Sequence, residues 1–322
     1  MTGRRIVVGT LVLAVLAAWM AWTLLPGAGD GARNDEARQT ARASDAPAQD
    51  ARERGDPPEP PPDAVLPSEA LPLAQRLPAL EALALAGNPE AACRLAVERI
   101  RCARLKRWQP DGFDRSREDR LEAEGKLDQA NDVANDSLLR IQQKSDCEAA
   151  GAGDDPDLLS LLAPAAAAGH GPAAVLYFEA GSNLHDQRGI YQHPGFDAWR
   201  RNAARQLQAA LDAGVPEASR SLLKAYAMDG DFASGLIGDD PARTWFHLVL
   251  SSQLFGTTIH PRTAARINLP EAERVRIAAE ATTFRRDRFG ERVFAGRALD
   301  AWGITRQPGS TASATCGPPI SL

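Results

Sequence analysis

Histidine spacing is the first test for metal or acid–base chemistry, and the chain has five histidines. His185, which is followed by Asp186, and His193 fall in one loop expected between Asn183 and Pro194, where they could in principle bind a metal. Their spacing matches no standard ligand pattern, so we interpret the segment as a surface loop. His170 falls in a turn, where a structural role is expected. Because Gly-x-Ser-x-Gly, His-Glu-x-x-His and phosphate-loop motifs are absent from the sequence, we expect no catalytic residue, no metal and no cofactor.

Four cysteines allow three disulfide pairings. If Cys93 and Cys102 share one helix, they lie about 13.5 Å apart along its axis and point to opposite faces, which is too far for a bond. We favour a bond between Cys102 and Cys147, because it would join the end of one helix to the end of the charged segment that follows. A bond between Cys93 and Cys147 is the rival, and Cys316 stays unassigned. Without a Cys-x-x-Cys pair, a zinc site is not expected.

The composition excludes several classes of protein. The 322 residues are 44% hydrophobic and 25% charged, which is too apolar for a wholly disordered chain and too charged for a multi-span membrane protein. With 42 acidic and 37 basic residues, the net charge is -5, and no nucleic-acid partner is expected. The preference for Ala and for Arg over Lys is typical of a GC-rich bacterial genome.

The first 25 residues predict a membrane anchor. Residues 6–25 carry no charge and, at about 1.5 Å per residue, would span the roughly 30 Å of a bilayer core. Arg4 and Arg5 precede this stretch, so the positive-inside rule places a stub of residues 1–5 in the cytoplasm and the rest of the chain in the periplasm. The alternative is a signal peptide cleaved near residues 27–29, which would leave a soluble periplasmic or secreted protein.

Polar segments flank a long region of helical pattern. Residues 26–70 form a Pro- and Ala-rich linker that cannot bury enough apolar surface to fold, and the proline run at 57–62 favours an extended spacer. Residues 71–305 lack the period-two alternation of strands, and we expect an all-α domain there. Residues 306–322 are expected to be a disordered tail.

Three segments of the helical region share one layout. In each, a glycine follows an Ala-rich helix, an alanine lies four residues later, and a large apolar residue lies eight residues later. Glycine readily ends a helix in the left-handed conformation, and a small alanine would let the next helix approach closely. The glycines are Gly87, Gly169 and Gly214, the alanines are Ala91, Ala173 and Ala218, and the apolar residues are Leu95, Tyr177 and Leu222.

This layout resembles the Sel1-like repeat, a relative of the tetratricopeptide repeat, over roughly residues 78–102 and 160–256. The second-helix half of that repeat is similar to the segments around Trp199 and Trp245. The resemblance implies a helical-hairpin solenoid or bundle that acts as a protein–protein interaction or scaffold module. With the predicted anchor, the expected partners are unidentified envelope proteins, alongside the inner membrane. The second glycine of the family pattern is missing, since Ala96, Phe178 and Leu223 stand there.

The spacing of the copies is irregular. Gly87 and Gly169 are 82 residues apart, and Gly169 and Gly214 are 45 apart, whereas a regular unit would be in the high thirties. We therefore expect about two units in the first interval and an insertion in the second. The highly charged residues 114–146 predict one long exposed helix or a hairpin interrupted near Gly125.

The last helix is expected from Pro270 to about Trp302, with arginines interspersed among acids. We interpret this pattern as a mixed solvated face, and an anion-binding patch is the alternative. Two other functions remain open: a cell-envelope enzyme with its site in the helical domain, or a ligand sensor in which the loop at 181–194 acts as a lid.

Overall fold

The computed structural model describes residues 65–109, 112–152, 157–183, 192–227, 238, 240–294 and 315–317. These ranges form eleven α-helices and contain no strand, as the all-α prediction requires. Of the two compact units of the chain, they belong to the second, which begins at Pro60. None of the described helices is long and apolar enough to cross a bilayer. The predicted anchor at residues 6–25 and the linker up to residue 64 lie outside the described ranges.

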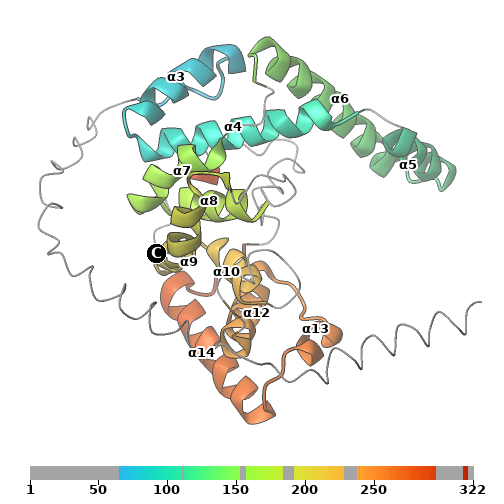
Figure 1. Cartoon of the computed structure of the whole chain (residues 1–322). Helices are drawn as coiled ribbons and strands as arrows, with labels where there is room; N and C mark the ends of the chain where they lie inside the picture. Colours follow the sequence, from blue (N-terminus) through green and yellow to red (C-terminus); the bar gives the residue numbers. More distant parts are fainter. Residues whose placement is uncertain are drawn as a thin grey trace, which may run out of the picture. The chain divides into compact units, whose positions relative to one another are not determined.

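The helices pack in consecutive pairs, each against the next along one series (Figure 1). The series runs α3, α4, α7, α8, α9, α10, α12 and α14, and the hairpin of α5 and α6 is inserted between α4 and α7. The bounds are α3 Leu73–Leu85, α4 Pro89–Arg107, α5 Gly112–Ala123, α6 Leu127–Ala149, α7 Leu158–Ala167, α8 Gly171–Asn183, α9 Phe196–Asp212, α10 Ala218–Tyr226, α12 Pro241–Phe255, α13 Pro261–Arg266 and α14 Glu271–Phe289.

The three predicted glycine turns share one backbone geometry. Gly87, Gly169 and Gly214 have φ of 88°, 85° and 90°, the left-handed region that only glycine enters at little cost. In each turn the N–H after the glycine donates to the carbonyl five residues earlier, as from Val215 to Ala210 at 3.0 Å. This bond is the signature of a glycine-terminated helix. The same hydrogen-bond pattern ends α5 at Gly125 and α6 at Gly151, although the three-residue layout of the sequence was not identified there.

The remaining signature residues occupy equivalent core positions. Ala91, Ala173 and Ala218 lie in the first turns of α4, α8 and α10 and are completely buried. The apolar residues one helical turn later, Leu95, Tyr177 and Leu222, are buried as well. Three copies of one pattern therefore place three leading helices against the helices before them.

The two units expected between Gly87 and Gly169 correspond in number to four helices, α4 to α7, but these do not stack as consecutive units. Helix α4 packs directly on α7 and α8, so the interval holds one helix pair, α4 with α7, together with the inserted α5–α6 hairpin. The residue spacing predicts that the hairpin is a unit of the series. Its two helices pack mainly on each other, however, and α6 also contacts α3 and α4. The alternative of a hairpin broken near Gly125 is confirmed, since α5 ends at Ala123 and Gly125 has φ of 72°.

Helix α14 ends earlier than predicted. It stops at Phe289, because Gly290 adopts φ of 62°, and residues 295–314 lie outside the described ranges. Two arginines of the expected mixed face cap this end: Arg285 donates to the carbonyl of Glu291 at 2.8 Å, and Arg292 donates to that of Phe289 at 3.2 Å. Cationic side chains are favourable at the negative end of a helix dipole, which is consistent with the position of these two arginines.

Candidate functional site

Two disulfides hold the described part of the chain. The predicted bond between Cys102 and Cys147 is confirmed, with 5.4 Å between the α-carbons. The rival pairing of Cys93 with Cys147 is wrong, because Cys93 bonds Cys316 across 223 residues. The expectation of a disordered tail does not hold at Cys316, which is completely buried. Disulfides of this kind persist in an oxidising compartment outside the cytoplasm.

His193 has a structural role in its loop. Its Nε2 lies 3.0 Å from Oδ1 of Asp157, and its Nδ1 accepts the N–H of Gly195. Asp157 in turn caps α7 by accepting the N–H of Ser160 at 3.0 Å. Partial burial alone would raise the pKa of Asp157, but the Ser160 bonds and the nearby His193 hold it below its usual value. His185 and Asp186 lie outside the described residues. Among the residues that the structure does describe, no three His, Cys, Asp or Glu side chains lie close enough together to hold a metal ion.

A second histidine, His247, is buried where α10 meets α12. Its imidazole stacks on the Tyr226 ring with 5.7 Å between centroids and planes 2° apart. Burial lowers the pKa of His247 to about 4, and the charge of Arg243 acts in the same direction. The Arg243 guanidinium donates to the hydroxyl of Tyr226 at 2.6 Å. The imidazole is thus neutral at physiological pH. Sequence reasoning missed this cluster, because its members come from two helices.

Buried carboxylates pair with cations rather than with each other. Glu98 on α4 lies 3.2 Å from the Arg76 guanidinium and 3.1 Å from that of Arg101. Glu179 on α8 accepts from Ser221 at 2.8 Å and from Lys224 at 2.9 Å. A buried charge is tolerated when it is paired and hydrogen-bonded, so these acids connect neighbouring helices.

Two cavities in the described ranges have few ionisable side chains, and the carboxylates among them are Glu280 and Asp287 in the first. One lies between α12 and α14 on a floor of Phe246 and Phe284, and its Arg276 and Glu280 are bonded to each other. The other has a floor of alanine and glycine beneath α9, with Arg205 donating to Asn202 at 2.7 Å. Neither is lined by a histidine or a cysteine.

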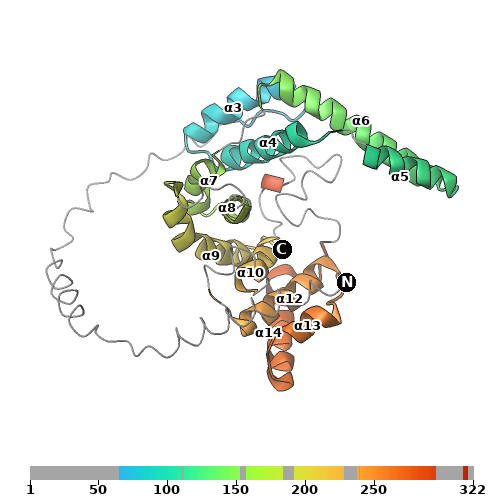
Figure 2. The ribbon, with the colours of Figure 1, turned by 45° about the vertical axis from the view of Figure 1, so that its right-hand side comes forward.

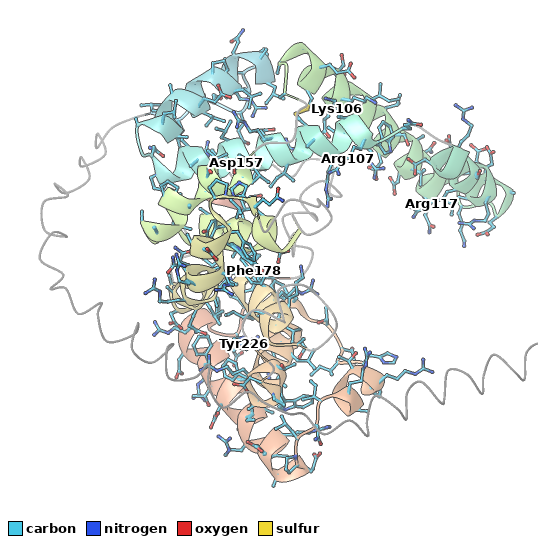
Figure 3. All side chains as sticks on the ribbon, viewed as in Figure 1. Lys106, Arg107, Arg117, Asp157, Phe178 and Tyr226 are labelled. Atoms are coloured by element: carbon cyan, nitrogen blue, oxygen red, sulfur yellow. A yellow bond between two sulfur atoms is a disulfide. The ribbon has the colours of Figure 1, made fainter. Side chains whose placement is uncertain are left out.

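The inserted hairpin, α5 with α6, is held firmly and is here called the arm. The Cys102–Cys147 bond fixes its end to α4. Lys144 donates to the Trp108 carbonyl at 3.1 Å, and the Arg140 guanidinium lies over the Trp108 ring at 5.9 Å and 3.6 Å from Asp114. The two cations of α6 therefore turn inward. Figure 3 shows Arg117 on the arm, apart from Phe178 and Tyr226 in the helical series.

The outer face of α6 is apolar and acidic. Four large apolar side chains of this helix are exposed, and at about 100° per residue three of them fall within one sector of roughly 60°. The three are Leu127, Leu138 and Ile141, with 61%, 64% and 48% of their surface exposed; the fourth is Leu139. The exposed carboxylate of Glu148 lies next to this sector, and those of Asp128, Asp132 and Asp146 lie roughly 80–120° further round the helix, beside Leu139. The sequence predicts an exposed, highly charged segment here, but it does not tell which apolar residues of that segment would face solvent.

The chain matches no protein-family model, no curated protein and no solved structure.

Proposed function

We propose that the protein is an interaction module of the bacterial cell envelope, tethered to the inner membrane by residues 6–25, that binds its partner through the outer face of α6. One observation carries this proposal: four of the exposed large apolar side chains lie on one helix of an arm that is inserted between α4 and α7, two helices that pack directly on each other. A monomer gains nothing from exposing several such side chains together, and such patches are typical of interaction surfaces.

The chemistry of the outer face favours a basic amphipathic helix of an envelope protein as the partner. Its apolar side would cover Leu127, Leu138 and Ile141, each contributing about 1 kcal/mol for the surface removed from water. Lysines or arginines along its two flanks would meet Glu148 on one side and Asp128 with Asp132, further round α6, on the other. An anionic lipid surface would be repelled by these acids, and a second copy of α6 would place acids against acids.

The location proposed for this module rests on two further observations. The disulfides indicate an oxidising compartment, and the uncharged residues 6–25 fit a signal anchor with the bulk of the chain in the periplasm. The resemblance to the Sel1-like repeat supports an interaction or scaffold role by analogy of fold. A tether would restrict the partner to the neighbourhood of the inner membrane.

Binding of designed helical peptides tests the proposal directly. We expect the oxidised protein to bind a labelled Leu/Lys amphipathic helix in fluorescence anisotropy, and to bind the matched Leu/Glu helix at least tenfold more weakly. The Leu138→Asp/Ile141→Asp variant should lose this binding. Val275→Asp on α14 is the control, because Val275 is as exposed, at 62%, but lies on another helix. Equal binding by both peptides, or by both variants, would contradict the proposal.

Proximity labelling in native cells then identifies the partner. The anchored chain should label a small reproducible set of envelope proteins. The arm variant and a form lacking residues 1–25 should each lose that set, whereas Val275→Asp should keep it. A set that persists without the apolar residues of α6 would assign the partner to another surface.

A further inference from the structure

A short piece of the C-terminal region is enclosed by the helical series. Residues 315–317 lie beside α4 and the start of α8, and the Cys316 side chain has no exposed surface (Figure 2). Its sulfur bonds that of Cys93 on α4, with 5.8 Å between the α-carbons. Both cysteines belong to the main core cluster. We call the surface formed by the first turns of α4 and α8 around Cys93 and His170 the tail site.

The main chain of the enclosed piece is recognised by His170. One ring nitrogen, Nδ1, accepts the N–H of Ala173 at 3.2 Å and thereby caps α8. The ring also donates a hydrogen bond to the main chain of Cys316, with Glu90 nearby. This arrangement uses a neutral imidazole that carries its proton on Nε2. Burial keeps the pKa of His170 below its usual value despite the opposing effects of Glu90 and Cys316.

Comparison with the first copy of the turn separates the two tasks of His170. Asn88 occupies the equivalent position, directly after the turn glycine, and caps α4 by accepting the N–H of Ala91 at 2.9 Å. Asparagine is a strongly preferred capping residue, so the cap itself does not require an imidazole. Unlike Asn88, His170 has a second ring nitrogen, and its imidazole lies near enough to the main chain of Cys316 for that carbonyl to oppose the fall in the His170 pKa.

We propose that the tail site is a peptide-binding site, and that the segment around Cys316 is a ligand tethered to it by the chain. The site would take a short turn of peptide with a small side chain at its centre, recognised through the main chain by His170. Extended surfaces that bind other chains are the usual use of stacked helical pairs. A tethered ligand has an effective concentration on the order of millimolar, so a free peptide would enter only after the tail has left. This site is separate from the arm and goes beyond the proposed function.

Cutting the folded chain tests the tail site. A protease sequence inserted between Arg306 and Gln307 allows cleavage of two full-length proteins, one with all four cysteines and one with Cys316→Ala. After cleavage and gel filtration, the protein with all four cysteines should keep its tail fragment. The Cys316→Ala protein should lose its tail fragment and then bind a labelled peptide of residues 311–322 carrying Cys316→Ala. Retention of the fragment without the disulfide, seen by mass spectrometry, would also support the site, because only non-covalent contacts could hold it.

The uncleaved wild-type protein should bind this peptide at least tenfold more weakly. Equal binding to cleaved and uncleaved forms would overturn the proposal, as would an emptied protein of unchanged helical circular dichroism that fails to bind. Cys93→Ala opens the same bond from the other side and replaces Cys316→Ala if that variant loses helical structure.

Substitutions at His170 separate recognition from helix capping. His170→Asn keeps the cap, as Asn88 shows, and should weaken the peptide about three- to tenfold through the lost hydrogen bond without changing helical content. The arm variant Leu138→Asp/Ile141→Asp should leave the affinity for the tail peptide unchanged. The experiment therefore distinguishes a wrong proposal for the tail site from a wrong proposal for the arm. A full-affinity His170→Asn variant would show that His170 does not recognise the peptide.

Discussion

The arm and the packed series are both built from helical hairpins, yet they differ in what their helices bury. The turn at Gly125 in the arm has the same left-handed glycine and the same terminal hydrogen bonds as the turn at Gly169 in the series. In the series the helices after such turns bury alanine, leucine and aromatic side chains, whereas α6 buries only Ala130 and Cys147. The turn fixes the local reversal of the chain, and the side chains that follow decide whether the hairpin stacks. The arm needs a disulfide because its own core is small.

Substitution at Trp199 should separate the two regions most strongly. Trp199 is fully buried in α9, and its ring packs beside Phe178 and Phe196 with centroids 6.1 and 5.9 Å away. Trp199→Ala should lower the free energy of unfolding by about 3–5 kcal/mol. Leu139→Ala on the arm is the control and should change it by less than about 0.5 kcal/mol. Urea unfolding followed by circular dichroism measures both, and similar losses would refute the contrast.

Removal of the arm disulfide should act on the arm alone. In Cys102→Ala/Cys147→Ala, the loss of a crosslink that closes 45 residues should cost about 3–4 kcal/mol. Hydrogen exchange should accelerate in α5 and α6 and stay slow in α8 and α9, because the α4–α7 contact does not pass through the arm. Uniform acceleration across the domain would mean that the arm supports the series.

Acid should weaken the series through His247. Its pKa is about 4 in the folded protein against about 6.5 in an unfolded chain, so the unfolded state binds the proton more readily. The stabilisation from the neutral ring is therefore complete above pH 6.5 and is lost as the pH falls from 6.5 to 4, by about 3 kcal/mol. His247→Leu should flatten this dependence in urea titrations at pH 7 and pH 4. An unchanged slope would assign acid sensitivity to other groups.

Replacing the turn glycine with alanine should destabilise the arm and the packed series by the same amount. A β-carbon at Gly125 or Gly214 would meet nothing within 4 Å, so only the backbone conformation opposes alanine there. Gly125→Ala and Gly214→Ala should each destabilise their hairpin by about 1–2 kcal/mol. Hydrogen exchange of the adjacent helices measures the two effects separately. A clearly larger cost at Gly214 would show that packing constrains that turn as well.

The sequence predicted those features of the fold that depend on local pattern. Gly87 forms the turn, Ala91 lies in the first turn of the next helix and Leu95 lies in the core, as their spacing predicts. The spacing has this effect because residues four apart in a helix lie on the same face. The predicted end of α14 near Trp302 is too late, since Gly290 ends the helix although the helical pattern of the sequence continues. The disulfide between Cys102 and Cys147 could be favoured because both residues were expected at helix ends.

Features that depend on distant contacts could not be predicted in this way. The bond between Cys93 and Cys316 joins segments 223 residues apart, and no local pattern relates them. The stacking of His247 on Tyr226 depends on how α12 packs against α10. The exposed side of α6 could not be predicted either, because its apolar residues alone do not tell which face the neighbouring helix covers.

The Cys93–Cys316 bond also turns most of the helical domain into a covalent ring. A single backbone cut at any peptide bond between these two residues leaves one molecule, so proteolytic nicking would not release a fragment under oxidising conditions. The bond shortens the mechanical path as well. Tension applied to the last residues of the chain would pass through the sulfur bridge to α4 and from there toward the N-terminus, without stretching the helices from α5 to α14.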